Sequence, residues 1–333
     1  MKRIVICADG TWNIRDQVDK ESGKRRPTNV TKLARAVLPG TVAGIDQIVI
    51  YDDGVGTGEG LDKYTGGAFG HGIESNVREL YRSILYNYSP SDEIYLFGFS
   101  RGAFTVRTLA GFMWMIGLVE KDDDYFVPEL YACYERQQGP GTTQWEHANR
   151  RVRGTRPCPP IRMIGVWDTV GALGAPGVLG QLFNKRKYRY HDIGLNPSIQ
   201  HAYQALAVDE QRKAFAPSVW TRPTGWTGVL QQSWFPGVHC NVGGGYSPDG
   251  LANGALHWIV DRATALGLEF DTNYLAFYQA RCDSYLADSM NPLYRAMGRM
   301  LRPTCVIDPS ESIHESVMCR RRANADYRPA NVP

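Results

Sequence analysis

Four short apolar runs stand out in the first half of the chain, each bounded by residues typical of turns. They are rich in β-branched side chains and do not alternate with polar residues, which is the pattern of strands buried on both faces. We therefore predict the strands of a parallel sheet over residues 3–7, 47–51, 93–97 and 161–166.

The segments between these runs place apolar residues at the three- and four-residue spacing of helices that bury one face. This spacing predicts helices over residues 28–37, 73–88 and 103–116, and later over 198–209 and 253–266, with Gly267 placed to end the last. Strand and helix thus alternate. The alternation predicts an α/β fold in which a mostly parallel, doubly wound sheet is covered by helices.

One domain over residues 1–333 accounts for this pattern, because no internal repeat or low-complexity linker divides the chain. Two stretches, 122–156 and 173–196, fit the alternation poorly. We expect both to be insertions over the carboxyl edge of the sheet, where they either form a lid over a functional site or decorate the surface. Residues 268–333 are expected to form a C-terminal extension of helices and irregular structure.

The composition is that of a globular protein, with 333 residues of which 43% are hydrophobic and 21% charged. Its 37 Lys and Arg against 34 Asp and Glu give a formal net charge of +3, too small for the basic footprint of a nucleic-acid-binding protein. The apolar run before Asp9 is shorter than the roughly 7–15 residues of a signal peptide. We expect a cytoplasmic protein, or one secreted without a signal peptide.

The cysteines are widely spaced and odd in number, and they form no CxxC or metal-finger pattern. They are Cys7, Cys133, Cys158, Cys240, Cys282, Cys305 and Cys319. This spacing predicts reduced thiols, as in proteins of the cytoplasm.

The sharpest local signal is the sequence EIYLFGFSRGAF at 93–104, in which a predicted strand is followed by Gly-x-Ser-x-Gly and a predicted helix. This is the context of a nucleophile elbow, a sharp turn that exposes a serine at a strand end. Gly98 and Gly102 are small where strand and helix must pass closely, and the helix directs its first N–H groups toward the serine. We predict that Ser100 is a catalytic nucleophile; a tight structural turn is the alternative.

A serine nucleophile needs a histidine to take its proton and an acid to orient that histidine. His239 is the best candidate, because it lies in a Gly-rich stretch, WFPGVHCNVGGGY, directly after an apolar segment. The other six histidines lie before the serine, in expected insertions or helices, or in the polar C-terminal tail. We therefore predict a mobile catalytic His239 on a loop.

Two carboxylates compete for the role of the acid. Asp168 follows the predicted strand 161–166, at the carboxyl end where the sites of α/β proteins gather. Asp209 is expected at the end of a helix, where pairing with Arg212 would be its ordinary role. Asp168 is the better candidate.

Acyl transfer also needs two N–H donors for the oxyanion, one of them on the residue after the nucleophile. Arg101 would supply the first. The turn ADGTWN after the first predicted strand would present the backbone of Gly10 or Thr11 as the second.

The same strand ends allow a metal-dependent interpretation. Hard oxygen ligands suit Mg²⁺ or Ca²⁺, and Asp9 with Asp52, Asp53 or Asn241 would supply them. The serine mechanism needs no metal and no other cofactor, and under it we expect none.

Six motifs together resemble one family, the uncharacterised α/β-hydrolase domain family that includes type VI secretion lipase effectors of the first class. They span about residues 1–270 and are DGTWN at 9–13, YDDGVGT at 51–57, GFSRGAFT at 98–105, WDTVG at 167–171, ALAVDE at 205–210 and FPGVH at 235–239. The resemblance implies an α/β-hydrolase-like fold with Ser100, Asp168 and His239 as the triad. It also implies hydrolysis of carboxylic esters, and of phospholipids by the secreted effectors.

One departure follows His239, where the family usually has Ser-Asp and this chain has Cys240–Asn241. A neutral amide cannot supply the charge of a carboxylate. Asn241, like Asp9 and Asp209, is therefore only a candidate supporting residue. The altered pair also motivates a second class of function, a non-catalytic scaffold that binds a ligand or partner.

Three basic runs would allow peripheral contact with anionic lipid head groups, although separated clusters are more often solvated loops. They are Lys24–Arg26, Lys185–Lys187 and Arg320–Arg322. The expected partner is thus an ester or lipid substrate, with membrane contact at most peripheral and no nucleic acid. The sequence contains no signal for an oligomeric state.

Overall fold

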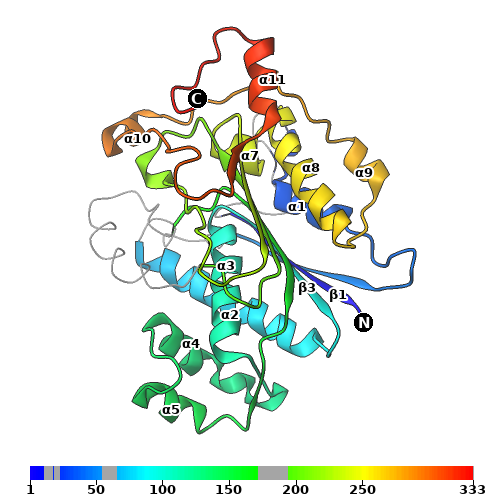
Figure 1. Cartoon of the computed structure of the whole chain (residues 1–333), viewed down its shortest axis with the longest axis vertical. Helices are drawn as coiled ribbons and strands as arrows, with labels where there is room; N and C mark the ends of the chain where they lie inside the picture. Colours follow the sequence, from blue (N-terminus) through cyan, green and yellow to red (C-terminus); the bar gives the residue numbers. More distant parts are fainter. Residues whose placement is uncertain (11–17, 19–22, 55–65, 172–193, 333) are drawn as a thin grey trace.

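The computed structural model describes residues 1–10, 18, 23–54, 66–171 and 194–332 (Figure 1). Its centre is a seven-stranded sheet in the order β2-β1-β3-β6-β7-β8-β9, and all neighbouring strands in it are parallel. These strands are β1 (Arg3–Ala8), β2 (Gln47–Asp52), β3 (Glu93–Phe99), β6 (Ile161–Trp167), β7 (His201–Ala207), β8 (Val229–Phe235) and β9 (Glu311–Ile313). The predicted α/β fold with a mostly parallel sheet is therefore confirmed.

Helices cover both faces of this sheet. One face shares a hydrophobic core with α2, α3 and α4, and the other shares a core with α1 and α8. The longer helices are α1 (Asn29–Ala36), α2 (Gly66–Asn87), α3 (Arg101–Ile116), α4 (Val127–Glu135), α8 (Gly250–Ala265) and α11 (Glu315–Ala323). The shorter ones are α5 (Thr143–Asn149), α7 (His239–Gly243), α9 (Thr272–Ala276), α10 (Pro292–Met297), η2 (Lys121–Phe126) and η3 (Lys213–Phe215).

The central strands lack polar alternation because both of their faces are buried. In β1, Ile4 and Ile6 enter one core, whereas Val5 and Cys7 enter the other, and all four are fully buried. Such a strand is apolar over nearly all of its length.

The sheet places the candidate residues at one edge. β1 lies between β2 and β3. The chain thus adds β2 on one side of β1 and β3 on the other, so the strand order changes direction at β1. In open α/β sheets, sites form at the carboxyl ends of the strands near such a switch point. Ser100 directly follows β3, Asp168 directly follows β6, and His239 follows β8 by a short turn.

The predicted helix over 198–209 is wrong. Residues 201–207 form β7, which pairs in parallel with β6 and β8 at the centre of the sheet. Six of its seven residues are buried, on both faces. Because a short, fully buried run lacks a polar face, its spacing does not distinguish strand from helix.

Residues 122–156 lie at the amino edge of the sheet, so the expectation that they form a lid over the carboxyl edge is wrong. They contain most of η2, then α4, α5 and the whole of β5 (Thr155–Arg156), which pairs with β4 (Leu118–Val119). α3 begins at the carboxyl edge and ends at the opposite edge, where β6 must begin, and Figure 1 shows α4 and α5 far from α7. The other expected insertion covers residues 173–196, and its residues 173–193 lie outside the described part of the chain.

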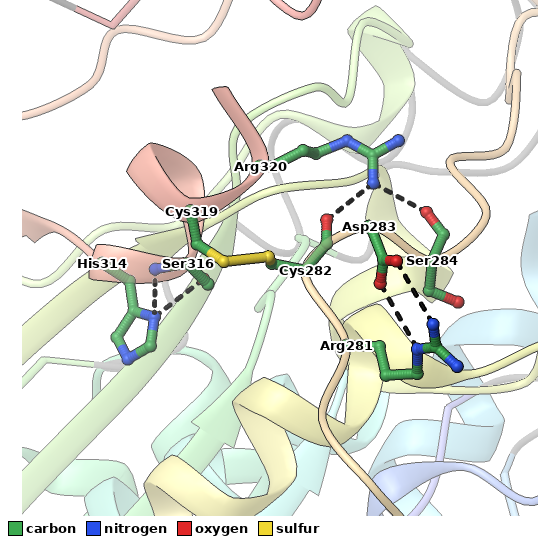
Figure 2. Close-up of a disulfide and its surroundings, with 8 residues drawn as sticks. All are labelled: Arg281, Cys282, Asp283, Ser284, His314, Ser316, Cys319 and Arg320. Carbon is green, nitrogen blue, oxygen red and sulfur yellow. Dashed lines mark hydrogen bonds and ion pairs between the residues drawn. A yellow bond between two sulfur atoms is a disulfide. The ribbon is translucent and has the colours of Figure 1, made fainter. Parts of the chain in front are cut away.

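The C-terminal segment, residues 268–332, is more than an irregular extension, because β9 adds a parallel strand to β8. A disulfide joins Cys282 to Cys319 of α11, with Cα atoms 6.0 Å apart (Figure 2). The expectation of reduced thiols is wrong for this pair, since the fold brings together two cysteines separated by 37 positions. Within the described ranges, the structure has no helix with the length and apolar character needed to span a membrane.

Candidate active site

Ser100 occupies the sharp turn between β3 and α3. Its backbone has φ 58° and ψ −118°, a left-handed conformation that is unusual for a residue with a side chain. A Cβ on Gly98 would lie 2.5 Å from the Gly102 carbonyl oxygen, and a Cβ on Gly102 would collide with the Ala8 carbonyl oxygen of β1. Both glycines are therefore required by close backbone contacts around the serine.

His239 is the first residue of the short helix α7, and not part of the loop that we predicted from the glycines. Its ring lies between Phe99 and Phe215, with centroid distances of 4.6 and 4.9 Å. Its Nε2 lies 2.8 Å from the Oγ of Ser100. The imidazole is therefore buried, and the two aromatic rings hold it in contact with the hydroxyl group of Ser100.

Asp168 is fully buried at the end of β6 and also has a positive φ, of 42°. Its Oδ2 lies 2.5 Å from His239 Nδ1, and its Oδ1 accepts a hydrogen bond of 3.0 Å from the Ala207 N–H. Ser100, His239 and Asp168 thus form one continuous chain of hydrogen bonds across three strand ends.

The surroundings of these three hydrogen-bonded residues set the charges of Asp168 and His239. Burial alone would raise the pKa of Asp168, but Arg302 and His239 outweigh it and hold that pKa well below the usual range. Burial lowers the pKa of His239, against the opposing effect of Asp168. At neutral pH the site therefore holds an ionised Asp168 beside a neutral imidazole that is able to accept a proton.

The three expected oxyanion donors have different surroundings. Arg101 is the first residue of α3, where a backbone N–H has no acceptor within the helix. The Gly10 N–H donates to the Asp9 Oδ1 at 2.7 Å, so in this state it points at that carboxylate. Thr11 lies outside the described residues.

Asp9 is buried, and both of its carboxylate oxygens accept hydrogen bonds. Besides Gly10, its donors are the hydroxyl groups of Thr28 and Tyr51, each at 2.5 Å, and of Thr31 at 3.1 Å. Asp9 therefore ties the turn after β1 to α1 and β2. In the part of the chain that the structure describes, no group of three or more His, Cys, Asp or Glu residues is arranged to hold a metal ion.

Asp209 and Asn241 support the turn that precedes His239. Asp209 accepts from the Gly237 N–H at 2.6 Å and from the Tyr327 hydroxyl at 2.8 Å. Asn241 accepts from the Val238 N–H at 3.3 Å. Asp209 follows a strand, and the expectation that it pairs with Arg212 at the end of a helix is wrong.

Arg212 instead forms a two-bonded ion pair with Glu210, and the sequence pattern predicted a place in the site for neither residue. Glu210 also accepts from the His239 N–H at 3.2 Å, and the Arg212 guanidinium lies over the Phe215 ring, 3.5 Å from its centroid. The sequence did contain a signal for Glu210, because this residue belongs to the motif ALAVDE.

A third missed residue is Arg302, which donates to both carboxylate oxygens of Asp168 at 2.6 and 3.0 Å. Both side chains are completely buried. No local pattern singles out Arg302, because its neighbours in MLRPT form no motif. Only the fold brings it to Asp168.

The described parts of the basic runs differ in exposure, since Lys24, Arg25 and Arg322 are exposed whereas Arg320 is not. Arg320 is buried and donates to the carbonyl oxygens of Cys282 and Ser284, so it is not available to a lipid head group (Figure 2). The run at 185–187 lies outside the described residues.

Comparison with known proteins yields relatives that are mostly longer than this chain. The uncharacterised yeast protein YEL023C, from Saccharomyces cerevisiae, is 29% identical over 149 residues, which cover 40% of this chain and 20% of that protein. An uncharacterised protein from Pseudomonas aeruginosa has a solved structure with a TM-score of 0.49 and 17% identity, covering 89% of this chain and 48% of the other. The chain thus spans between a fifth and about half of these relatives.

A further solved structure, the Tle1 effector bound to the VgrG spike of the type 6 secretion system, has a TM-score of 0.41 and 22% identity, covering 74% of this chain and 51% of the other. The family model described as "T6SS, Phospholipase effector Tle1-like, catalytic domain" matches residues 2–262. This match covers most of the chain and includes Ser100, Asp168 and His239. The chain therefore belongs to the family of Tle1-like phospholipase effectors of type VI secretion, as represented by their catalytic domain.

Proposed function

We propose that this protein is a serine hydrolase of carboxylic esters, and that its substrates are phospholipid acyl esters. The observation that supports it most strongly is the hydrogen-bonded chain from Ser100 through His239 to Asp168, with Ser100 on a left-handed turn. This arrangement has the connections that a catalytic triad requires. The family description supports the phospholipid substrate.

In the first half of the reaction, Ser100 Oγ attacks the ester carbonyl carbon while His239 Nε2 takes the hydroxyl proton. The carbonyl electron pair moves to the oxygen, and the Arg101 N–H stabilises the resulting oxyanion together with a second donor, either Thr11 or Gly10, whose N–H must first leave the Asp9 carboxylate. The tetrahedral intermediate then collapses. The bond to the leaving alcohol breaks, His239 returns the proton to that alcohol, and the acyl group stays on Ser100.

In the second half, a water molecule attacks the acyl carbon and gives its proton to His239. Collapse of the new intermediate breaks the bond to Ser100, whose Oγ takes back the proton, and the fatty acid leaves. Asp168 stays ionised throughout and offsets the charge of the imidazolium. Every step uses groups of the chain itself and water.

The test measures fatty-acid release from phospholipid vesicles and from soluble short-chain esters, for the parent protein and Ser100→Ala. We expect release from both substrates by the parent, and a loss of about 10⁶-fold in kcat in the variant. Ser83→Ala is the matched control, because it removes a hydroxyl of α2 that donates to the Glu79 carbonyl oxygen.

Each outcome of this test has a meaning. Cleavage of soluble esters alone would contradict the phospholipid substrate and leave the triad mechanism. Absence of hydrolysis by the parent, or full hydrolysis by Ser100→Ala, would contradict the triad mechanism and favour a binding scaffold or another nucleophile.

We also propose that the type VI secretion machinery delivers this protein, because the family to which it belongs is described by that system. The test is its release into the medium by cells with an intact machinery and by cells in which the machinery is inactivated. Equal release from both would contradict the proposal.

A further inference from the structure

Arg302 has an unusual environment for an arginine. Its guanidinium makes four hydrogen bonds, two to the carboxylate of Asp168 and one each to the carbonyl oxygens of Ala207, at 2.9 Å, and Phe215, at 2.7 Å. Its side chain has no exposed surface. Arginine in such a planar, two-bonded contact fixes a carboxylate in both position and orientation.

The backbone around Arg302 is held at several points. The Met300 N–H donates to the Gln211 carbonyl oxygen at 2.8 Å, so this stretch pairs with the chain that leaves β7. The Asn331 side chain donates to the carbonyl oxygens of both Arg302 and Val208, at 3.1 and 3.0 Å. The stretch that carries Arg302 is therefore tied both to the chain that follows β7 and to Asn331 near the end of the described residues.

The disulfide closes the loop in which Arg302 lies. Cys282 precedes Arg302 and Cys319 follows it, and the bond between them confines the intervening chain. The matched family region ends at residue 262, so Arg302 and both of these cysteines lie beyond it.

We propose that Arg302 is a positioning residue of the triad, which holds Asp168 ionised and in register with His239 and so makes hydrolysis depend on the C-terminal segment. This inference rests on the proposed function. An isolated buried carboxylate is expensive, and it would either take up a proton or turn away from the imidazole. The guanidinium offsets that charge without approaching the serine, since both of its terminal nitrogens are already bonded to Asp168 and to the backbone.

Among the described residues, five charged, titratable or reacting groups lie around the imidazole or its acid, with the acid itself included. They are Ser100 after β3, Asp168 after β6, Glu210 and Arg212 after β7, and Arg302 from the C-terminal segment. Glu210 and Arg212 are paired with each other, as are Asp168 and Arg302. Removal of Arg302 leaves a net negative charge beside His239.

The consequence is a shift in pH dependence. Without Arg302, the pKa of Asp168 rises, because burial is no longer opposed by the adjacent cation. The pKa of His239 rises as well, because the uncompensated carboxylate stabilises the imidazolium. Both changes move the acid limb of the activity profile to higher pH.

The experiment compares the parent chain with Arg302→Gln, Arg302→Lys and Arg320→Gln, measuring kcat, KM and the pH profile on a soluble ester. Arg320 is the matched control, because it is also buried in the C-terminal segment but donates to the backbone at Cys282 and Ser284. For Arg302→Gln we expect kcat to fall about 100-fold with KM nearly unchanged. The acid limb should move up by about one pH unit or more.

Arg302→Lys retains the charge and loses the two-bonded geometry. We expect it to keep the parental acid limb while its kcat falls below that of the parent, and this comparison with the parent tests the inference even if the glutamine variant fails to fold. Where both variants fold, the lysine variant should lose less kcat than Arg302→Gln. Arg320→Gln should keep both the parental kcat and the parental acid limb.

This inference would be overturned if both Arg302 variants kept the parental kcat and the parental acid limb while Ser100→Ala was inactive. The proposed function would then remain intact. A loss of kcat with an unmoved acid limb in Arg302→Gln, or an equal loss in Arg320→Gln, would show only a structural role and would also overturn it. Full activity of Ser100→Ala would instead contradict the proposed function itself.

Discussion

The nucleophile elbow, residues 93–116, and the C-terminal segment both contribute to the candidate site, but the sequence encodes them differently. In the elbow, Gly98, Ser100 and Gly102 lie within five positions; close backbone contacts require both glycines, and the turn between them carries the serine. In the C-terminal segment, Arg302 reaches Asp168 across 134 positions of chain. The comparison teaches that the geometry of the serine is a local property, whereas the state of the acid depends on distant parts of the chain.

The two regions meet at Asp168, and its substitution should have the largest effect. In Asp168→Asn the amide lacks the negative charge that stabilises the imidazolium, and it favours the wrong imidazole tautomer, so kcat should fall about 10⁴-fold. The control is Asp209→Asn, at the end of the neighbouring strand, whose amide oxygen still accepts from Gly237. We expect the control to retain activity within about tenfold. Similar losses in both variants would contradict the assignment of Asp168.

Removal of the disulfide tests how much this crosslink stabilises the C-terminal segment. Cys282→Ser opens the loop between Cys282 and Cys319, and we expect the free energy of unfolding to fall by about 2–4 kcal/mol. Cys305→Ser removes an exposed free cysteine and should change it by less than about 0.5 kcal/mol. Denaturant unfolding under oxidising conditions measures both. Equal stability of the two variants would show that the crosslink does not stabilise the segment.

The close packing of the elbow can be tested in the same way. Gly102→Ala puts a methyl group against the Ala8 carbonyl oxygen, and we expect a loss of about 1–3 kcal/mol in unfolding free energy together with reduced kcat. Gly254→Ala is the control in α8, where an added Cβ meets nothing within 4 Å, and it should stabilise the helix by about 0.5–1 kcal/mol. If Gly102→Ala is as stable and active as the parent, the elbow does not require the small residue.

The smallest expected effect concerns how kcat/KM of the parent protein depends on pH. Burial lowers the pKa of His239 from its ordinary value of 6.5, and only the neutral imidazole can take the serine proton. We therefore expect kcat/KM on a soluble ester to be constant above about pH 6.5 and to fall only at lower pH. An acid limb centred clearly above that value would contradict a buried neutral base.

Sequence reasoning reached the parts of this molecule that depend on local pattern. The predicted helix 28–37 matches α1, for which Thr28 is the N-cap, because capping and burial act over a few residues. The α/β fold and the parallel sheet followed from apolar strands that are buried on both faces. Ser100, Asp168 and His239 lie within bonding distance because each of them follows a strand of that sheet.

What the sequence could not supply depends on tertiary contacts. The spacing of residues 198–209 predicts a helix where the structure has β7, because a seven-residue run with six buried residues is too short for its spacing to distinguish strand from helix. The pairing of Cys282 with Cys319 and the approach of Arg302 to Asp168 join segments with no shared motif. The position of residues 122–156 follows from the direction of α3, which only the sheet topology fixes.

The most direct test of the central claim is covalent labelling by a fluorophosphonate, which reacts with an activated serine, followed by mass spectrometry of the intact and digested protein. We predict a single adduct on Ser100 of the parent, strongly reduced labelling of Asp168→Asn, and none of Ser100→Ala. An unlabelled parent, or an adduct that persists in Ser100→Ala, would contradict the claim that Ser100, His239 and Asp168 form a working triad.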